Sequence, residues 1–177
     1  MMLVCLALAA WSSSSRSAEV DLSLERKVKA AFLYQFIPYV QWPPQAIGSR
    51  DAPFVIAVLG SDDTIADLTE VIGGRTVEGR PVVVRRWRDS DAQGGVHIVY
   101  VRRVDTARVA AIARAAQAAG MLLVTEAEGA LNQGSMINFH IVDGKVRFDV
   151  ALPVVEKAGL RVSSRLLAVA HDVRSQP

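Results

Sequence analysis

Short continuous apolar runs limit the folds that this chain can adopt. PFVIAVLG (53–60), VHIVYV (96–101) and MLLVTEA (121–127) are each bounded by polar or glycine-containing segments. Runs of this length without polar alternation are typical of β-strands that are buried on both faces. Such strands need helices on both sides of the sheet, so a mostly parallel α/β arrangement is the first expectation.

The segments between these runs carry helix signals. Ser61-Asp62-Asp63 can cap a helix that Gly73-Gly74 ends, and an alanine-rich segment stops at Gly120. The helices predicted after the first one cover about 62–72, a stretch from Asp105 or Thr106 to Gly120, a short segment opened by Pro153, and RLLAVAHDV after Ser163 or Ser164.

Hairpin signals complete the pattern. The segment GSMINFHIVDGKVRFDVAL alternates on both sides of Asp143-Gly144, a strong two-residue hairpin turn. An earlier turn at Glu78-Gly79 precedes a strand at about 81–87. We therefore predict an α/β fold: a three-layer α/β/α sandwich with a mostly parallel mixed sheet and a C-terminal β-hairpin at its edge.

The N-terminus resembles a secretory signal. MMLVCLALAAW is apolar, is too short for a membrane span of about 20 residues, and is followed by four serines. The run has no basic start, and Arg16 lies three residues before the end of the segment at Ala18. We predict a signal over 1–18 and a single domain over 19–177; the alternative is a buried N-terminal helix, which the serines would end early. The single cysteine, Cys5, would leave with the signal, so the mature chain could form no disulfide.

The next segment, DLSLERKVKAAFLYQFIPYVQWPP, predicts a helix that is apolar on more than one face. A helix with one solvent-exposed face needs only one apolar stripe. This helix is therefore either packed on more than one side within the core or in contact with another chain. Pro38 predicts its end near Ile37. We predict that Leu33, Ile37, Tyr39 and Trp42 form a partner or dimer interface, with burial in the core as the alternative.

A small basic cluster lies at the end of the strand predicted at about 81–87. Arg86 and Arg88 would share one face of an extended chain, opposite Trp87. They are candidates for binding an acidic partner; the alternative is a charged edge strand that prevents aggregation. The whole chain has 20 Lys and Arg against 18 Asp and Glu, which argues against a dedicated nucleic-acid binder.

The polar residues show no catalytic or metal-binding pattern along the sequence. Histidine is the usual base, but His97 fits a structural strand residue, His140 lies on the hairpin, and His171 falls near the end of the predicted last helix. No two histidines have metal-ligand spacing, and VLGSDDT has one glycine where a dinucleotide loop needs three. The pairs Asp62/Asp63 and Glu126/Glu128 fit a helix start and a solvated strand end. We therefore predict no catalytic, metal or cofactor residues and no enzymatic activity.

The chain resembles the YfiR family of bacterial periplasmic regulators. The resemblance rests on blocks in the same order along the mature chain: KAAFLYQFIPYVQWP, FVIAVLG, GRTVEGRPVVVRR, VHIVYV, GSMINF, GKVRFDV and AGLRVSSRLLAVA. The chain departs from the family pattern at Val96, where relatives often have cysteine, at Ser135, where they often have glycine, and at Ala151, where they often have asparagine. The first departure removes any redox control by that cysteine, and the other two could alter an edge or a binding surface.

The resemblance implies a function. It implies a periplasmic binding protein that holds an inner-membrane diguanylate cyclase, or a similar sensor such as a histidine kinase, inactive through its periplasmic domain. Cyclic-di-GMP and biofilm formation would then fall, and the protein would form homodimers without spanning the membrane. Two alternatives stay open: a periplasmic small-ligand sensor with a pocket near Gly60 or Glu126, and an unrecognised hydrolase.

Overall fold

The computed structural model describes residues 11–102 and 108–176, with side chains from Leu22 onward. Its helices are α1 (Trp11–Phe36), α2 (Pro44–Ile47), α3 (Asp62–Ile72), α4 (Val109–Ala119), α5 (Leu152–Lys157) and α6 (Ser164–Leu167), with short 3₁₀ segments η1 (Ile37–Tyr39), η2 (Asp89–Gln93) and η4 (Ala130–Gln133). Its strands are β1 (Val40–Gln41), β2 (Phe54–Leu59), β3 (Thr76–Val77), β4 (Arg80–Arg86), β5 (Ile98–Val101), β6 (Leu122–Thr125), β7 (Ile137–Val142), β8 (Lys145–Ala151), β9 (Arg161–Val162) and β10 (Asp172–Arg174).

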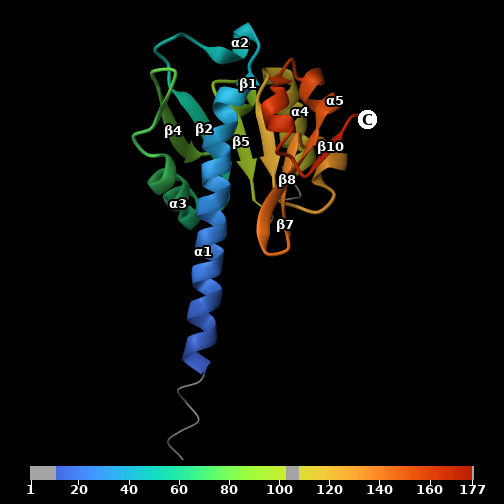
Figure 1. The fold of residues 1–177 in the computed structure, drawn as a ribbon. Coiled ribbons are helices and arrows are strands. Elements are labelled where there is room, and N and C mark those ends of the chain that lie inside the picture. The colour runs from blue at the N-terminus through green and yellow to red at the C-terminus, as the bar shows by residue number, and fades with distance from the viewer. Residues whose placement is uncertain (1–10, 103–107, 177) are drawn as a thin grey trace, which may run out of the picture.

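The main sheet has eight strands in the order β10-β8-β7-β6-β5-β2-β4-β3. Its central pairs, from β4 through β2, β5 and β6 to β7, are parallel. Helices α1 and α3 pack together on one face, and α4 lies on the other (Figure 1). The predicted three-layer α/β sandwich with a mostly parallel mixed sheet is confirmed.

The apolar runs form the centre of the sheet as predicted. Strands β5 and β6 are buried at every residue, and β2 is buried at all but one. Among the described residues, every buried side-chain nitrogen or oxygen has a hydrogen-bond partner. The core is therefore continuous through the middle of the sheet.

The predicted turns are also present. Asp143 and Gly144 have positive φ values of 49° and 70°, the conformation that the two-residue hairpin between β7 and β8 requires. Glu78 and Gly79 also have positive φ values, at the turn between β3 and β4. Ser61 caps α3 through its side chain, which accepts a hydrogen bond from the Thr64 N–H.

The C-terminal segment differs from the prediction. RLLAVAHDV was expected to be one helix, but α6 ends at Leu167 and residues 172–174 pair in parallel with β8. The hairpin therefore lies next to the sheet edge, and the short strand β10 is the edge strand on that side. This long-range pairing outweighs the local helical pattern.

Helix α1 begins before the predicted mature N-terminus. Figure 1 shows its C-terminal half lying along the sheet and its N-terminal half projecting beyond the domain. It includes the four serines at 12–15, which do not end it. Residues 1–10 of the predicted signal lie outside the described residues, and no described helix has the length and apolarity needed to cross a bilayer.

Candidate functional site

Aromatic rings attach α1 to the sheet. Phe36 lies 5.1 Å from Phe148 and 5.9 Å from Phe139, measured between ring centroids. Phe32 lies 5.5 Å from Phe148. Each such pair adds about 0.5–1.5 kcal/mol to ordinary apolar burial, so this part of α1 is firmly bound to the β7–β8 hairpin.

A buried ionic network joins α1 to the carboxyl ends of β5 and β6. Lys29 of α1 forms ion pairs with Glu25 and with Glu126, and both Lys29 and Glu126 are almost fully buried. Glu126 also accepts hydrogen bonds from the Arg102 Nε at 2.8 Å and from the Tyr100 hydroxyl at 3.0 Å. Glu126 is therefore not the solvated strand end that the sequence suggested.

The network fixes the charge state of its carboxylate. Burial acts to raise the pKa of Glu126, but the Lys29 and Arg102 cations outweigh it and hold the pKa below its usual value. Burial and the Glu126 charge raise the pKa of Tyr100 well above its usual value. Glu126 therefore stays ionised and Tyr100 stays a hydrogen-bond donor.

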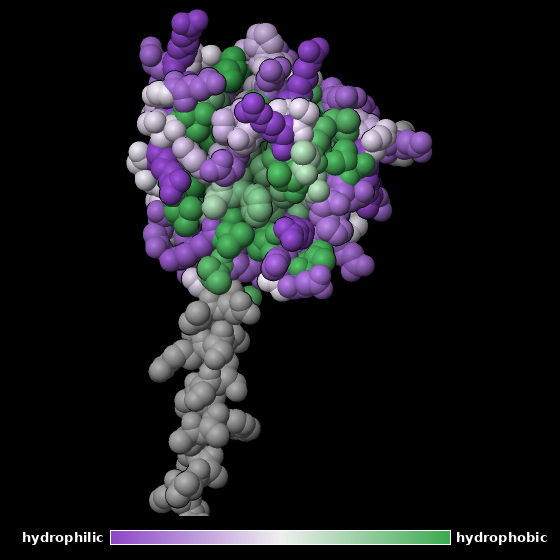
Figure 2. Space-filling view, viewed as in Figure 1, coloured by the Kyte–Doolittle hydropathy of each residue, from purple (hydrophilic) through white to green (hydrophobic). Residues whose placement is uncertain are grey.

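An apolar groove lies where α1 leaves the domain. It has a volume of about 620 Å³ and separates α1 from the tip of the β7–β8 hairpin. We call it the α1–hairpin groove; its lining residues are Leu22, Leu24, Glu25, Val28, Phe32, Ile141, Gly144, Lys145 and Val146. Figure 2 shows hydrophobic side chains gathered on this face beside α1.

The groove exposes an unusual amount of apolar surface. Leu22, Leu24 and Ile141 are 55%, 59% and 45% exposed. Large apolar side chains that cluster on a surface in this way mark interaction sites more often than scattered ones do. None of these residues was predicted as an interface residue, although Leu24 lies in the segment that was predicted to be a helix apolar on more than one face.

The interface residues predicted on the first helix and the segment that follows it do not line the groove. Leu33, Ile37 and Trp42 are buried in the core, at 0%, 2% and 9% exposure. Trp42 donates a hydrogen bond from its indole nitrogen to the His97 carbonyl at 3.2 Å. Tyr39 is half-buried and packs against the core. In this structure the first three offer no free surface, and an interface role for the set stays a prediction.

The two predicted arginines are both exposed but are not on one strand face. Arg86 ends β4 and forms an ion pair with the exposed Asp62. Arg88 lies beyond the strand, at the start of η2. An exposed pair such as Arg86–Asp62 contributes little to stability, and both arginines are exposed to solvent. Their interface role also stays a prediction.

His97 is a structural residue. Its Nδ1 accepts a hydrogen bond from the Val55 N–H at 3.2 Å, and its Nε2 lies 3.3 Å from the Ile47 carbonyl. Burial lowers its pKa, and the nearby Arg80 charge acts in the same direction, against the hydrogen bond to Ile47. The ring is therefore a neutral component of the core beside Trp42 and Phe54.

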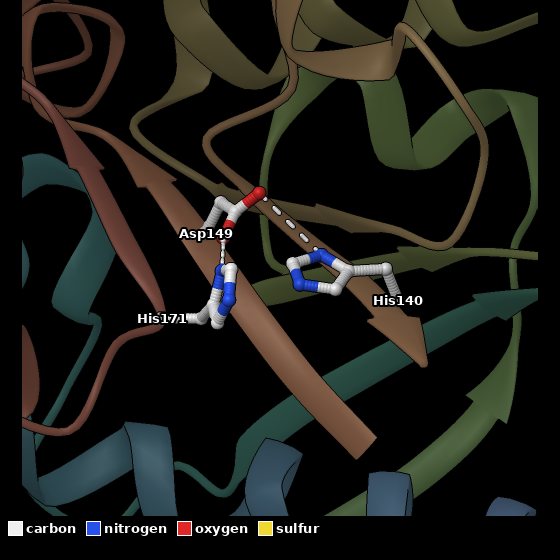
Figure 3. A group of neighbouring side chains, drawn as sticks. All are labelled: His140, Asp149 and His171. Atoms are coloured by element: carbon white, nitrogen blue, oxygen red, sulfur yellow. Dashed lines mark hydrogen bonds and ion pairs between the residues drawn. The ribbon is translucent and has the colours of Figure 1, made fainter. Parts of the chain in front are cut away.

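The other two histidines lie together. Figure 3 shows the Asp149 carboxylate between the imidazoles of His140 and His171, which lie 5.0 Å apart between ring centroids. His171 is not in a helix, contrary to the prediction, because the chain there turns into β10. The histidines lack metal-ligand spacing along the chain, and that spacing did not reveal that two of them lie together in the fold.

A polar pocket of about 420 Å³ borders this cluster. It is lined by residues 126–131, by residues 138–141, by Asp149 and by Arg174. A possible ligand pocket was predicted near Gly60 or Glu126. The pocket includes Glu126 but not Gly60.

The three departures from the family pattern lie inside the molecule. Val96, Ser135 and Ala151 are all buried. The Ser135 hydroxyl forms a hydrogen bond with Thr125 at 2.8 Å. All three positions are therefore buried, and Ala151 pairs with Arg174 of the edge strand β10.

Together these features define a three-layer α/β domain with an apolar groove beside a projecting helix. The chain belongs to the YfiR/HmsC-like family, whose model matches residues 26–171. Membership supports a role as a periplasmic regulator of diguanylate cyclase signalling in general. No curated protein matches the chain.

A solved structure has a similar fold. It is a conserved domain protein from Vibrio cholerae O1 biovar El Tor strain N16961, with a TM-score of 0.52 and 12% sequence identity. The match covers 84% of this chain and 60% of that chain, so this chain corresponds to little more than half of its length. At this identity the likeness supports the fold alone.

Proposed function

We propose that the protein is a periplasmic inhibitor that binds the periplasmic domain of an inner-membrane diguanylate cyclase, or of a similar sensor kinase, through the α1–hairpin groove. Binding holds the receptor inactive and lowers cyclic-di-GMP. The observation that carries the proposal is the exposed apolar groove in a member of the YfiR/HmsC-like family. Export after loss of residues 1–18 and assembly as a homodimer are part of the same proposal.

The shape and charge of the groove favour an amphipathic helix of the receptor as its occupant. One wall is the α1 helix and the other is the hairpin tip, so an apolar helix face fits between them. Glu25 and Lys145, of opposite charge, lie among the apolar lining residues. A receptor helix with an apolar stripe flanked by charges of both signs would be complementary.

Repression then follows from a difference in affinity. The receptor exchanges between inactive and active conformations, and a protein that binds both equally shifts nothing. Consider a receptor that is about 99% active on its own. To hold about 99% of it inactive, the protein must bind the inactive form roughly 10⁴-fold more tightly than the active form. The groove must therefore bind a helix arrangement that the active receptor does not present.

The test uses charge substitutions that should leave the fold intact. Leu24→Glu and Ile141→Lys each place a charge in the groove at an exposed position. Val169→Glu is the matched control, because Val169 is 63% exposed and does not line the groove. The measurements are co-purification with the full-length cyclase in detergent and the cellular level of cyclic-di-GMP.

We expect both groove variants to bind at least ten times more weakly and to let cyclic-di-GMP rise, while Val169→Glu behaves as wild type. Wild-type binding by both groove variants would reject the groove as the docking site. Failure of the wild-type protein to bind any membrane cyclase or sensor kinase of its host would reject the function itself.

A second candidate, a small-ligand sensor, is favoured by the polar pocket near Glu126. Thermal unfolding with a panel of periplasmic metabolites tests it. A ligand at 100 times its Kd would stabilise the protein by about 2.7 kcal/mol. A panel without any shift in Tm would count against this candidate.

A further inference from the structure

Three metal-ligating side chains converge on the face of the β7–β8 hairpin that carries Asn138. We call His140, Asp149 and His171 the His-Asp-His cluster; each offers a ligand atom, and these atoms lie within 4.8 Å of one another. Their side chains are 27%, 18% and 47% exposed, so the cluster is sheltered but open to solvent on one side. Figure 3 shows both imidazoles directed at the carboxylate.

The distances between these groups are long for direct hydrogen bonds and leave room for a shared ion. The His140 Nδ1 lies 3.4 Å from one Asp149 oxygen, and the His171 Nδ1 lies 3.3 Å from the other. Good N–H···O hydrogen bonds are about 2.7–3.2 Å long. Ligand atoms on a tetrahedral ion with bonds of about 2.0–2.1 Å lie roughly 3.3–3.4 Å apart. The two histidine–carboxylate distances match that spacing but reach different oxygens of Asp149. Small rotations of the side chains would bring the three ligand atoms, which lie within 4.8 Å of one another, around one ion.

The backbone fixes each of these ligands in place. His140 and Asp149 lie on paired strands whose register is set by the Asp143-Gly144 turn. His171 is held by a hydrogen bond from its own N–H to the Phe148 carbonyl at 2.8 Å. A site built on paired strands needs little rearrangement to accept an ion.

The surrounding charges are mixed. Arg147 lies opposite His140 on the hairpin, and the nearby Arg174 donates a hydrogen bond to the Asn132 side chain at 2.8 Å. Asp172 lies in register with Asp149 on β10 and offsets one of these cations. The cluster itself supplies two imidazole nitrogens and one carboxylate oxygen, a donor set that suits zinc-type ions.

We propose that His140, Asp149 and His171 bind a divalent transition-metal ion, of which Zn²⁺ is the reference case, with a fourth position open to water or another ligand. The open position follows from the presence of three protein ligands, since zinc takes four. The ion would tie the short edge strand β10 to the hairpin. This inference does not depend on the proposed receptor.

The binding test uses the full mature chain, purified without a histidine tag and stripped of metal with EDTA. Zinc chloride is titrated by calorimetry at pH 7.5, and cobalt(II) chloride is titrated by visible absorption. We expect one zinc per chain, a Tm that rises with zinc, and the strong visible bands of four-coordinate cobalt.

The variants His140→Asn, Asp149→Asn and His171→Asn should each weaken zinc binding by about 100-fold or more. Loss of groups that merely orient a ligand already costs about 10–100-fold, so loss of a ligand itself should exceed that range. Asp89→Asn is the control, since it removes an exposed carboxylate outside the cluster and outside the charges that surround it, and it should bind as wild type. Circular dichroism checks that every variant is folded.

Two results would overturn the proposal. The first is a folded wild-type chain that takes up no zinc or cobalt at concentrations well above micromolar. The second is zinc binding that survives intact in the folded double variant His140→Asn/His171→Asn. Both are read on the protein alone, so they leave the receptor proposal untouched.

Discussion

Two clusters in this molecule place a carboxylate between two basic groups, and they differ in burial. Glu126 lies between Lys29 and Arg102, and the side chains of Lys29 and Glu126 are only 6% and 5% exposed. Asp149 lies between two histidines, of which His171 is about half exposed. The first cluster consists of permanent charges with full hydrogen bonding, so it binds α1 to the sheet. The second consists of exchangeable donors open to solvent, so it can take a ligand.

The largest predicted effect breaks the buried cluster. Glu126→Gln keeps the shape of the side chain but leaves Lys29 and Arg102 facing a neutral group. Breaking a buried ion pair from one side costs about 3–5 kcal/mol, because a charge is left without its partner. We expect the free energy of unfolding in urea to fall by about 3 kcal/mol or more.

The partner substitution should cost less. In Lys29→Met, Glu126 keeps its hydrogen bonds from Arg102 and Tyr100. The double variant Lys29→Met/Glu126→Gln should recover part of the loss, since no buried lysine charge then faces a neutral group. If the free energy of unfolding of Glu126→Gln lies within about 1 kcal/mol of the wild-type value, the network does not anchor α1.

The next largest predicted effect is the loss of stability at acidic pH. The folded pKa of His97 lies below its usual 6.5, so the unfolded chain takes up a proton first and stability falls as pH drops below 6.5. The folded pKa of Glu126 lies below its usual 4.5, so its stabilisation is present above pH 4.5 and is lost as pH falls through the folded value. Each unit of pKa difference corresponds to about 1.4 kcal/mol.

Urea unfolding at a series of pH values separates the two contributions. In His97→Gln, the free energy of unfolding should decrease less between pH 6.5 and 5 than it does in the wild type. In Glu126→Gln, it should decrease less below pH 4.5. A wild-type stability that does not change between pH 7 and 5 would contradict the assignment of His97 as a neutral core residue.

Sequence patterns predicted the parts of this comparison that depend on local structure. The buried strands and the hairpin turn were predicted because apolar runs and Asp-Gly turns act over a few residues. The hairpin register could also have placed His140 near Asp149, since Asn138 pairs with Asp149. The start of α6 was predicted, but its early end and strand β10 were missed, because β10 forms by pairing with a strand more than 20 residues earlier.

The polar clusters were missed for the same reason. Glu126 is 97 residues from Lys29, and no local pattern links them. A lysine within an otherwise apolar helix face, four residues after a glutamate, was the one available signal for a buried charge. His171 joins the other cluster only through β10, so its position depended on a pairing that the sequence did not reveal.

The smallest predicted effect lies in the exposed cluster and gives the sharpest contrast with Glu126. In metal-free protein, Asp149→Asn removes a carboxylate that is only partly buried, from partners that water can also satisfy. Exposed ion pairs are worth about 0–1 kcal/mol, so the free energy of unfolding in EDTA should fall by less than about 1 kcal/mol. The same change at Glu126 should cost several times more, although both variants exchange a carboxylate for an amide between two basic groups. If Asp149→Asn costs as much as Glu126→Gln in EDTA, the His-Asp-His cluster is a structural unit like the buried one. A small cost together with lost zinc stabilisation would show that burial separates the charges that hold this fold from the donors that are free to bind.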